Sequence, residues 1–233
     1  MTDQPASVTI PTGDGDMPAH LWLPPSGTGP GLVVLQEIFG VSDYIRSRSA
    51  DLAALGYVVL APEIYWRLDE AGRDESGDDF LERAMGLVAR VEWPRAVADA
   101  VAALGALRGR AEVTGGTGVL GFCFGGGLAF EVAAHADPDV LVAYYGSALP
   151  QLLDLAPAVR APSLHHFGTE DAYIPMGTVE RIREAVAGPE VEFRLHEGAG
   201  HAFDNPHPMF HHARASAEAW TQTTDFLARR LPV

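Results

Sequence analysis

The sequence predicts an α/β fold, with a mostly parallel central sheet and helices on both faces. Short apolar runs such as Leu32–Leu35 alternate with longer segments of helical periodicity, and this alternation is typical of parallel strands joined by crossover helices. The runs are apolar at successive positions, as expected of strands covered on both faces. The chain has 233 residues, and we expect one domain spanning residues 1–233.

The elements follow one another in a regular order. Strands at Ser7–Ile10 and Ala19–Leu23 flank the turn-forming residues 12–16, and we expect an antiparallel hairpin at a sheet edge. Further strands are predicted at Leu32–Leu35, Tyr57–Ala61, Gly118–Phe122, Val140–Tyr145, Ser163–Phe167 and Val191–Leu195. Helices are predicted at Asp43–Leu55, Asp78–Val91, Pro94–Leu107, Phe124–Ala136, Met176–Ala187 and His211–Leu231. The polar segment Tyr65–Gly77 is expected to be an irregular surface excursion.

Composition excludes several kinds of chemistry. Arg and Lys total 16, all of them Arg, against 31 acidic residues, so the formal charge is −15. This charge argues against nucleic acid and against an anionic membrane surface as partners. Without lysine there is no Schiff base, pyridoxal-phosphate anchor or Walker A site. With one cysteine, Cys123, there is no internal disulfide and no multi-cysteine zinc site, and we expect neither a metal nor a cofactor.

The N-terminal residues and the hydropathy of the sequence indicate where in the cell the protein is expected. The acidic N-terminal residues do not resemble a signal peptide, and no run approaches the length of a membrane span. We therefore expect a cytoplasmic protein. The net charge favours solubility without fixing the assembly, so we expect a monomer or a small homo-oligomer.

Residues 117–127, TGVLGFCFGGG, have the form of a nucleophile elbow with cysteine in place of serine. A nucleophile on a sharp strand-to-helix turn projects from the sheet, and glycines two residues before and after it remove Cβ clashes. The helix that begins at Phe124 aims its free N–H groups at Cys123, where they should favour a thiolate and stabilise an oxyanion. The alternative is a buried, inert cysteine beside a glycine-rich turn.

Two later strands also end in polar residues. Asp171 lies a few residues past the strand at 163–167, where it could orient a histidine, or simply cap the next helix or close a turn. Glu170 is an alternative candidate for the orienting role. His201 lies on a small-residue loop after the strand at 191–195, and its alternative is a surface loop residue. Cysteine, acid, then histidine is the chain order of the α/β-hydrolase triad, and each member follows a separate predicted strand.

The remaining histidines fit that scheme less well. His165 and His166 lie inside a predicted strand, whereas His207, His211 and His212 lie beyond the loop. These last three lack accompanying carboxylates or cysteines in a convincing metal-ligand spacing, so we interpret them as a solvated stretch that enters the last helix. Glu37 directly follows the strand at 32–35, at the level expected for the site, although it could also be an exposed loop acid.

Together these segments resemble the dienelactone hydrolase family of the α/β-hydrolases. The matching pieces are QEIFG (36–40), GYVVLAPEIY (56–65), GFCFGGGLAF (121–130), AYYG (143–146), FGTEDAYIP (167–175) and GAGHAF (198–203). The resemblance implies a triad of Cys123, His201 and Asp171, with Glu37 helping to activate the cysteine. It also implies oxyanion donors in the N–H groups of Ile38 and Phe124, and a position near the site for Tyr144.

The sequence differs from the family at the arginine positions expected near the site. The family's dienelactone members bind the substrate carboxylate with two arginines, one of them four residues after the catalytic histidine. Here that position is Asn205, and the other arginine corresponds loosely to Arg83. An asparagine cannot replace a bidentate arginine. Arg67 and Arg73 are alternative cations, and Phe203 is a further candidate for the substrate pocket.

The expected function is hydrolysis of a small ester or lactone through an acyl-cysteine, with dienelactone itself as one possible substrate. Thioester hydrolysis or acyl transfer on the same triad is an alternative. A non-catalytic ligand-binding protein that kept the fold is another, since a fold alone does not decide activity.

Overall fold

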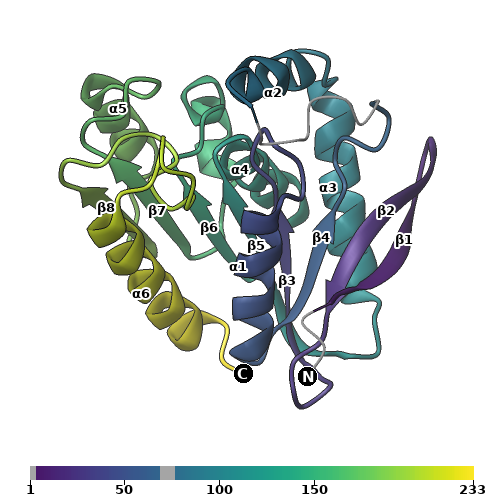
Figure 1. The fold of residues 1–233 in the computed structure, drawn as a ribbon. Coiled ribbons are helices and arrows are strands. Elements are labelled where there is room, and N and C mark those ends of the chain that lie inside the picture. Colours follow the sequence, from purple (N-terminus) through teal and green to yellow (C-terminus); the bar gives the residue numbers. More distant parts are fainter. Residues whose placement is uncertain (1–3, 69–76) are drawn as a thin grey trace. The chain divides into compact units, whose positions relative to one another are not determined.

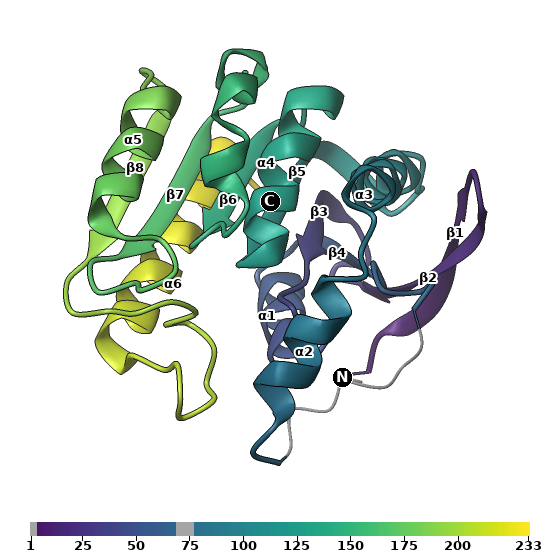
Figure 2. The same cartoon turned by 90° about the horizontal axis from the view of Figure 1, so that it is seen from above.

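The computed structural model describes residues 4–68 and 77–233, and the chain divides into two compact units. The first comprises residues 1–117 with Val233, and the second comprises residues 118–232. Each unit has helices on both faces of its strands (Figures 1 and 2), so the fold is α/β as expected; a single domain stays a prediction. Residues 69–76, which include Arg73 and most of the expected excursion, lie outside the described residues.

The first unit contains an antiparallel hairpin and a parallel strand pair. Its strands are β1 (Ala6–Thr12), β2 (Gly15–Trp22), β3 (Gly29–Leu35) and β4 (Val58–Pro62), in the spatial order β1-β2-β4-β3. β2 is antiparallel to both β1 and β4, whereas β3 and β4 are parallel. The expected edge hairpin is therefore confirmed, with Thr12 opposite Gly15 at its turn.

The helices of the first unit lie on opposite faces of its strands. They are α1 (Asp43–Ala54), α2 (Phe80–Val88) and α3 (Trp93–Arg108). α1 covers one face and α3 the other (Figure 2), and Leu52 of α1 and Leu104 of α3 are fully buried. Pro94 lies in the first turn of α3, as expected.

The second unit consists of adjacent parallel strands. They are β5 (Val113–Phe122), which begins in the first unit, β6 (Val140–Tyr144), β7 (Ser163–Gly168) and β8 (Val191–His196), in that order. The helices α4 (Phe124–Ala136) and α5 (Met176–Val186) cover one face, and α6 (Ala213–Arg230) covers the other (Figures 1 and 2). Two 3-10 helices, Leu149–Gln151 and Leu153–Ala158, connect β6 to β7.

Several boundaries differ from the prediction. β5 begins at Val113 and not at Gly118. Residues 113–117 contain glycine and threonine without an apolar pattern, so the sequence did not indicate that they form strand. α2 ends at Val88 and not at Val91. β8 is the last strand in the order and is partly exposed along most of its length, so the expectation that it is covered on both faces is wrong. Tyr65, at the start of the expected surface excursion, is fully buried.

The parallel strands of the second unit bring their carboxyl ends to one edge, where open α/β sheets bind ligands. Cys123 directly follows β5, and the loops after β7 and β8 carry Asp171 and His201. Across residues 4–68 and 77–233, no helix combines the length and the apolar character needed to cross a bilayer.

Candidate active site

Cys123 lies on the tight turn between β5 and α4. Its φ of 51° and ψ of −111° are unusual for a residue other than glycine. A Cβ on Gly121 would lie 1.9 Å from the carbonyl oxygen of Gly125, and one on Gly126 would lie 2.7 Å from that of Tyr144. The backbone therefore requires glycine at both positions, and Cys123 stands on the expected strand-to-helix turn at the N-terminus of α4. The second crowded glycine is Gly126, three residues after Cys123 and not the two that were expected.

The side chains of Cys123, His201 and Asp171 form one hydrogen-bonded chain. Nε2 of His201 lies 3.1 Å from Sγ of Cys123, and Nδ1 of His201 lies 2.7 Å from Oδ2 of Asp171. The Asp171 side chain is fully buried and that of His201 is 11% exposed. This arrangement has the nucleophile–base and base–orienter contacts of a catalytic triad.

Asp171 has two roles in this geometry. Its Oδ1 accepts hydrogen bonds from the N–H groups of Tyr173 at 2.8 Å and Ile174 at 3.0 Å, while Oδ2 faces His201. Asp171 therefore closes the turn at 171–174 and also lies against the histidine, and its role in orienting that histidine for catalysis stays a prediction. Glu170 is exposed, and its backbone N–H donates to Ala199, so the structure brings Asp171 and not Glu170 to the histidine.

The two loops that carry Asp171 and His201 are joined by hydrogen bonds. The N–H of Thr169 donates to the carbonyl of His196 at 3.0 Å, and its Oγ1 accepts from the N–H of Gly198 at 2.9 Å. A Cβ on Gly168 would lie 2.1 Å from the carbonyl oxygen of Ala199. This close contact fixes the acid and the base relative to each other.

The charges in the site favour a protonated histidine. Burial acts to lower the pKa of His201, but the Cys123 thiolate and the Asp171 carboxylate outweigh it, so the pKa lies well above its usual value.

Backbone strain gathers around these residues. Within the described part of the chain, four residues other than glycine have clearly positive φ, and three of them belong to this site: Cys123, Tyr145 and Ala202. Such conformations persist where the surrounding structure enforces them, and they cluster at functional sites.

Tyr144, the last residue of β6, and Tyr145, which follows it, occupy different environments. The Tyr144 hydroxyl is buried beneath α6, 2.6 Å from Oγ1 of Thr223, and donates to the carbonyl of Ala219. The ring of Tyr145 instead lies 5.3 Å from that of His201. Sequence reasoning named Tyr144 and missed Tyr145, although the alternation of side chains along a strand puts the two on opposite faces.

Two further aromatic residues lie near the histidine. Tyr173, which sequence reasoning also missed, has its ring 5.1 Å from His201. Phe203 is fully buried, with its ring 5.1 Å from that of Tyr145 and 4.8 Å from that of His196. The structure thus places Phe203 in the packing behind the triad, and its part in substrate binding stays a prediction.

Asn205 bonds within its own loop, and its neighbour Asp204 bonds to α6. The Asn205 side-chain oxygen accepts from the N–H of His207 at 2.9 Å, and Asp204 accepts from Ser216 at 2.7 Å. Both side chains are buried. Asn205 therefore helps to hold the loop after His201, and any contact with substrate stays a prediction.

The other histidines lie in separate parts of the fold. His165 and His166 are fully buried in β7, and Nδ1 of His212 accepts from the N–H of Ala215 at the start of α6. Among the residues that the structure describes, no group of three or more His, Cys, Asp or Glu is suited to a metal ion.

Glu37, Ile38 and Arg83 belong to the first unit. Glu37 follows β3 and is buried, and the Gln36 side chain links its carbonyl to the N–H of Ile64. Ile38 is partly buried in the same turn. Arg83 forms an ion pair with Asp79 on α2. Their roles at the triad stay predictions.

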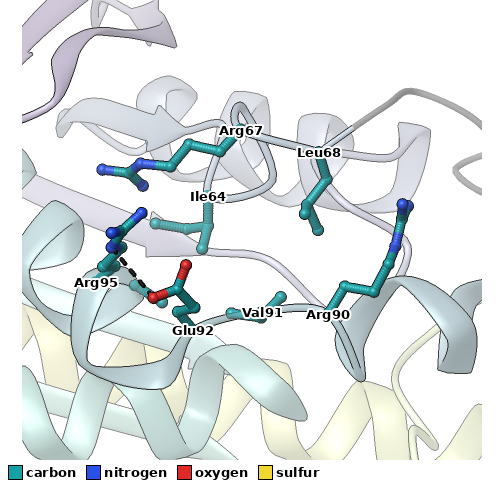
Figure 3. Close-up of a pocket in the computed structure, with 8 residues that line it drawn as sticks. Ile64, Arg67, Leu68, Arg90, Val91, Glu92 and Arg95 are labelled. Atoms are coloured by element: carbon teal, nitrogen blue, oxygen red, sulfur yellow. Dashed lines mark ion pairs between the residues drawn. The ribbon is translucent and has the colours of Figure 1, made fainter.

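Arg67, a further candidate cation, has acidic partners within its own unit. It binds Asp99 and also Asp14, the latter at 2.9 Å. It borders a cavity of about 40 Å³ between the segment after β4 and the start of α3, across from the Arg95–Glu92 pair (Figure 3). None of the triad residues lines this cavity.

The fold and this site define the class of protein: the chain has the α/β-hydrolase fold. A protein from Klebsiella pneumoniae subsp. pneumoniae, provisionally named a dienelactone hydrolase, superimposes with a TM-score of 0.84 at 29% identity, covering 96% of this chain and 97% of the other.

The family follows from sequence comparison. The profile of the dienelactone hydrolase family matches residues 17–231, so the chain belongs to this family. The carboxymethylenebutenolidase of Pseudomonas sp. (strain P51) is 34% identical over 95% of this chain and 93% of its own length. That of Pseudomonas putida is 33% identical over 88% of each. The protein is therefore a carboxylic ester hydrolase.

Proposed function

We propose that the protein hydrolyses small esters or lactones through a triad of Cys123, His201 and Asp171. The observation that carries the proposal is the hydrogen-bonded chain from Sγ through the imidazole to a buried carboxylate. A thiolate attacks an activated carbonyl, an imidazole transfers protons, and a carboxylate holds the imidazole in its working orientation.

The reaction has two stages. In the first, the Cys123 thiolate adds to the carbonyl carbon, the C–O bond to the leaving group breaks, and the imidazolium of His201 gives its proton to the departing oxygen. In the second, His201 takes a proton from water, the hydroxide attacks the acyl-cysteine, and the C–S bond breaks to release the carboxylic acid. Atoms and charges balance without a metal or an organic cofactor.

The oxyanion formed in each stage needs hydrogen-bond donors. The N–H of Phe124, at the start of α4 directly after Cys123, is one proposed donor, and the N–H of Ile38 is the other. Glu37 is proposed to take part in activating the thiol. The dipole of α4 adds favourable potential at the same end of the helix.

The proposed substrates are small esters and lactones with good leaving groups. The relatives are named carboxymethylenebutenolidase, so an unsaturated lactone is the first substrate class to try. An enol leaving group departs readily, whereas an amine would leave less readily than the thiolate. We therefore expect amides to react slowly.

Turnover of p-nitrophenyl acetate tests the nucleophile. Replacing Cys123 by Ala removes the attacking atom, and we expect kcat/KM to fall by about 10³-fold or more. His135→Gln, at an exposed position on α4, is the control and should retain wild-type turnover. A Cys123→Ala protein as active as the wild type would contradict the proposal.

A further inference from the structure

β8 forms an open edge of the sheet in the second unit. It pairs with β7 on one side, and among the described residues no strand pairs with its other side (Figure 1). Such an edge presents backbone N–H and C=O groups to other chains, and proteins commonly protect it with prolines, bulges or charges. β8 contains no proline, and its pairing with β7 runs without a bulge from Val191 to His196. Its two charged residues, Glu192 and Arg194, have opposite signs.

The hydrogen bonds to β7 show which backbone groups of β8 face the open side. The carbonyls of Glu190 and His196 accept, each at 3.0 Å, from N–H groups of β7 and of the residue after it. Alternate residues of a strand bond to the same parallel neighbour, so the even-numbered residues of β8 face β7. The C=O of Val191 and both backbone groups of Phe193 and Leu195 therefore face the open edge.

The side chains of β8 divide into an apolar face and a polar face. Successive side chains of a strand point to opposite sides of the sheet, so Val191, Phe193 and Leu195 share one side, and Glu192 and Arg194 share the other. None of the three apolar side chains is fully buried, and Leu195 is 39% exposed. A second strand laid along this edge would cover part of the apolar row.

A second copy of β8 fits this edge in antiparallel orientation and in one particular register. The free backbone groups belong to odd-numbered residues, so odd-numbered residues must lie opposite one another. If Phe193 lies opposite its own copy, two-fold symmetry places each Glu192 opposite the Arg194 of the other chain. The two neighbouring registers place Glu192 opposite Glu192, or Arg194 opposite Arg194. Opposite charges directly across a strand pair are stabilising and like charges are destabilising, so the first register is favoured.

The charges around the edge are compatible with a second copy of the chain. Glu192 accepts from Arg194 on its own strand and from Arg229 at the end of α6, each at 2.6 Å, and Glu190 pairs with Arg230 at 2.6 Å. Three arginines and two glutamates therefore meet here. The acidic excess of the chain, −15 in total, is not concentrated at this edge.

We propose that the protein forms a symmetric dimer in which two copies of β8 pair edge to edge, with Phe193 opposite its own copy. The two Phe193 residues exchange backbone hydrogen bonds, and each Leu195 N–H donates to the Val191 carbonyl of the other copy. The N–H of Val191 keeps its bond to the carbonyl of Gly188, at 3.2 Å. The apolar rows of the two strands become continuous. This inference does not depend on the proposed function.

Sedimentation velocity tests the dimer and its register. The wild type should sediment with twice the mass of the chain at about 100 μM and dissociate on dilution to about 1 μM, as expected of a small interface. Arg194→Glu places carboxylates opposite one another, so the dissociation constant should rise by about tenfold or more. Adding Glu192→Arg to this variant restores opposite charges across the edge and should restore the dimer.

Arg95→Glu, at an exposed position on α3, is the control, because it changes the net charge equally away from β8 and should leave the dissociation constant unchanged. A wild type that is monomeric at about 100 μM, an Arg194→Glu protein that dimerises as tightly as the wild type, or a double variant no tighter than Arg194→Glu would each overturn the inference. Species larger than a dimer would assign β8 a different partner strand and would also overturn it.

Hydrogen exchange checks the register without any substitution. The amides of Phe193 and Leu195 should exchange about threefold more slowly at 100 μM than at 1 μM, because only the dimer bonds them. The amides of Glu192 and Arg194 face β7 in both states and should exchange at the same rate at both concentrations. Unchanged exchange at Phe193 and Leu195 in a wild type that does dimerise would place the interface elsewhere and overturn the inference.

Discussion

Gly121 illustrates, at the scale of single residues, how little space the turn at Cys123 leaves. A Cβ there would overlap the carbonyl oxygen of Gly125 at 1.9 Å, and that oxygen belongs to the backbone and not to a flexible side chain that could move aside. We expect Gly121→Ala to lower the free energy of unfolding by several kcal/mol, about 3 or more, because a steric overlap of this kind forces the turn to distort.

The control for this substitution is Gly105→Ala. Gly105 lies inside α3, with open space around its Cβ position, so alanine should raise the free energy of unfolding by about 0.5–1 kcal/mol. Urea denaturation of both variants gives the comparison. Equal stability of Gly121→Ala and the wild type would show that the turn is not as tight as described.

Asp171→Asn separates the two roles of this carboxylate. An amide oxygen can still accept from the N–H groups of Tyr173 and Ile174, but the negative charge opposite His201 is lost. We expect kcat/KM to fall by about 10²–10⁴-fold, with only a small change in the urea midpoint. A variant that keeps full activity would contradict the orienting role, and a variant that fails to fold would show that the turn needs the charge.

The proximity of Cys123, His201 and Asp171 could be predicted from the sequence because each follows a strand and each has a distinct local pattern. Tyr145 and Tyr173 could not, because nothing in the sequence shows that loops after β6 and β7 turn their rings toward His201. The hydrogen bond from the N–H of His207 to the side-chain oxygen of Asn205 could not be predicted either, because the resemblance to the family concerned only a substrate contact at this position, and that contact stays a prediction.

At the scale of elements, α6 covers a buried polar cluster built on β7 and β8. Nδ1 of His166 lies 3.0 Å from Nε2 of His196, and Nε2 of His166 lies 3.1 Å from Oγ1 of Thr223 on α6. Burial lowers the pKa of His196 to about 4, and burial, with repulsion from His196 when that ring is protonated, lowers the pKa of His166 well below its usual value. The folded protein therefore holds both imidazoles neutral.

This cluster predicts a loss of stability in acid. The unfolded chain protonates these histidines near pH 6.5, while folded His196 resists protonation down to about pH 4. Between these values the unfolded state binds more protons, so the free energy of unfolding should fall as the pH falls from 6.5 toward 4. Urea denaturation across that range measures the slope.

His196→Gln tests the origin of this slope, because glutamine retains hydrogen-bonding capacity and does not titrate. We expect a shallower loss of stability in this variant than in the wild type, whereas His135→Gln, at an exposed position, should leave the slope unchanged. Identical slopes for all three proteins would assign the acid sensitivity to other groups.

The element boundaries show where sequence patterns were sufficient. The helix at Phe124–Ala136 was predicted to the residue, because Cys123 and the glycines define its start. The first half of β5 and the 3-10 helices after β6 were missed, because their residues have no apolar periodicity and their conformation depends on neighbouring strands and helices. The exposure of β8 follows from its place at the end of the strand order, which its own residues do not encode.

At the scale of the whole molecule, the α/β class and the family could be read from the chain, since they depend on the alternation of elements and on several motifs in a fixed order. The net charge of −15 remains compatible with a small uncharged substrate. Which cations approach the triad could not be read, because that depends on how distant segments fold. Arg67, one of the candidate cations, is bonded in its own unit to two acidic residues, Asp14 and Asp99.

Direct detection of the acyl-enzyme tests the central claim, that Cys123 is the nucleophile. Wild-type protein mixed with p-nitrophenyl acetate and quenched in acid within the first turnovers should carry one acetyl group, and peptide mapping by mass spectrometry should locate it on Cys123. The Cys123→Ala protein should carry none. Acetylation of a different residue, or continued turnover by a wild-type protein that never becomes labelled, would contradict the account.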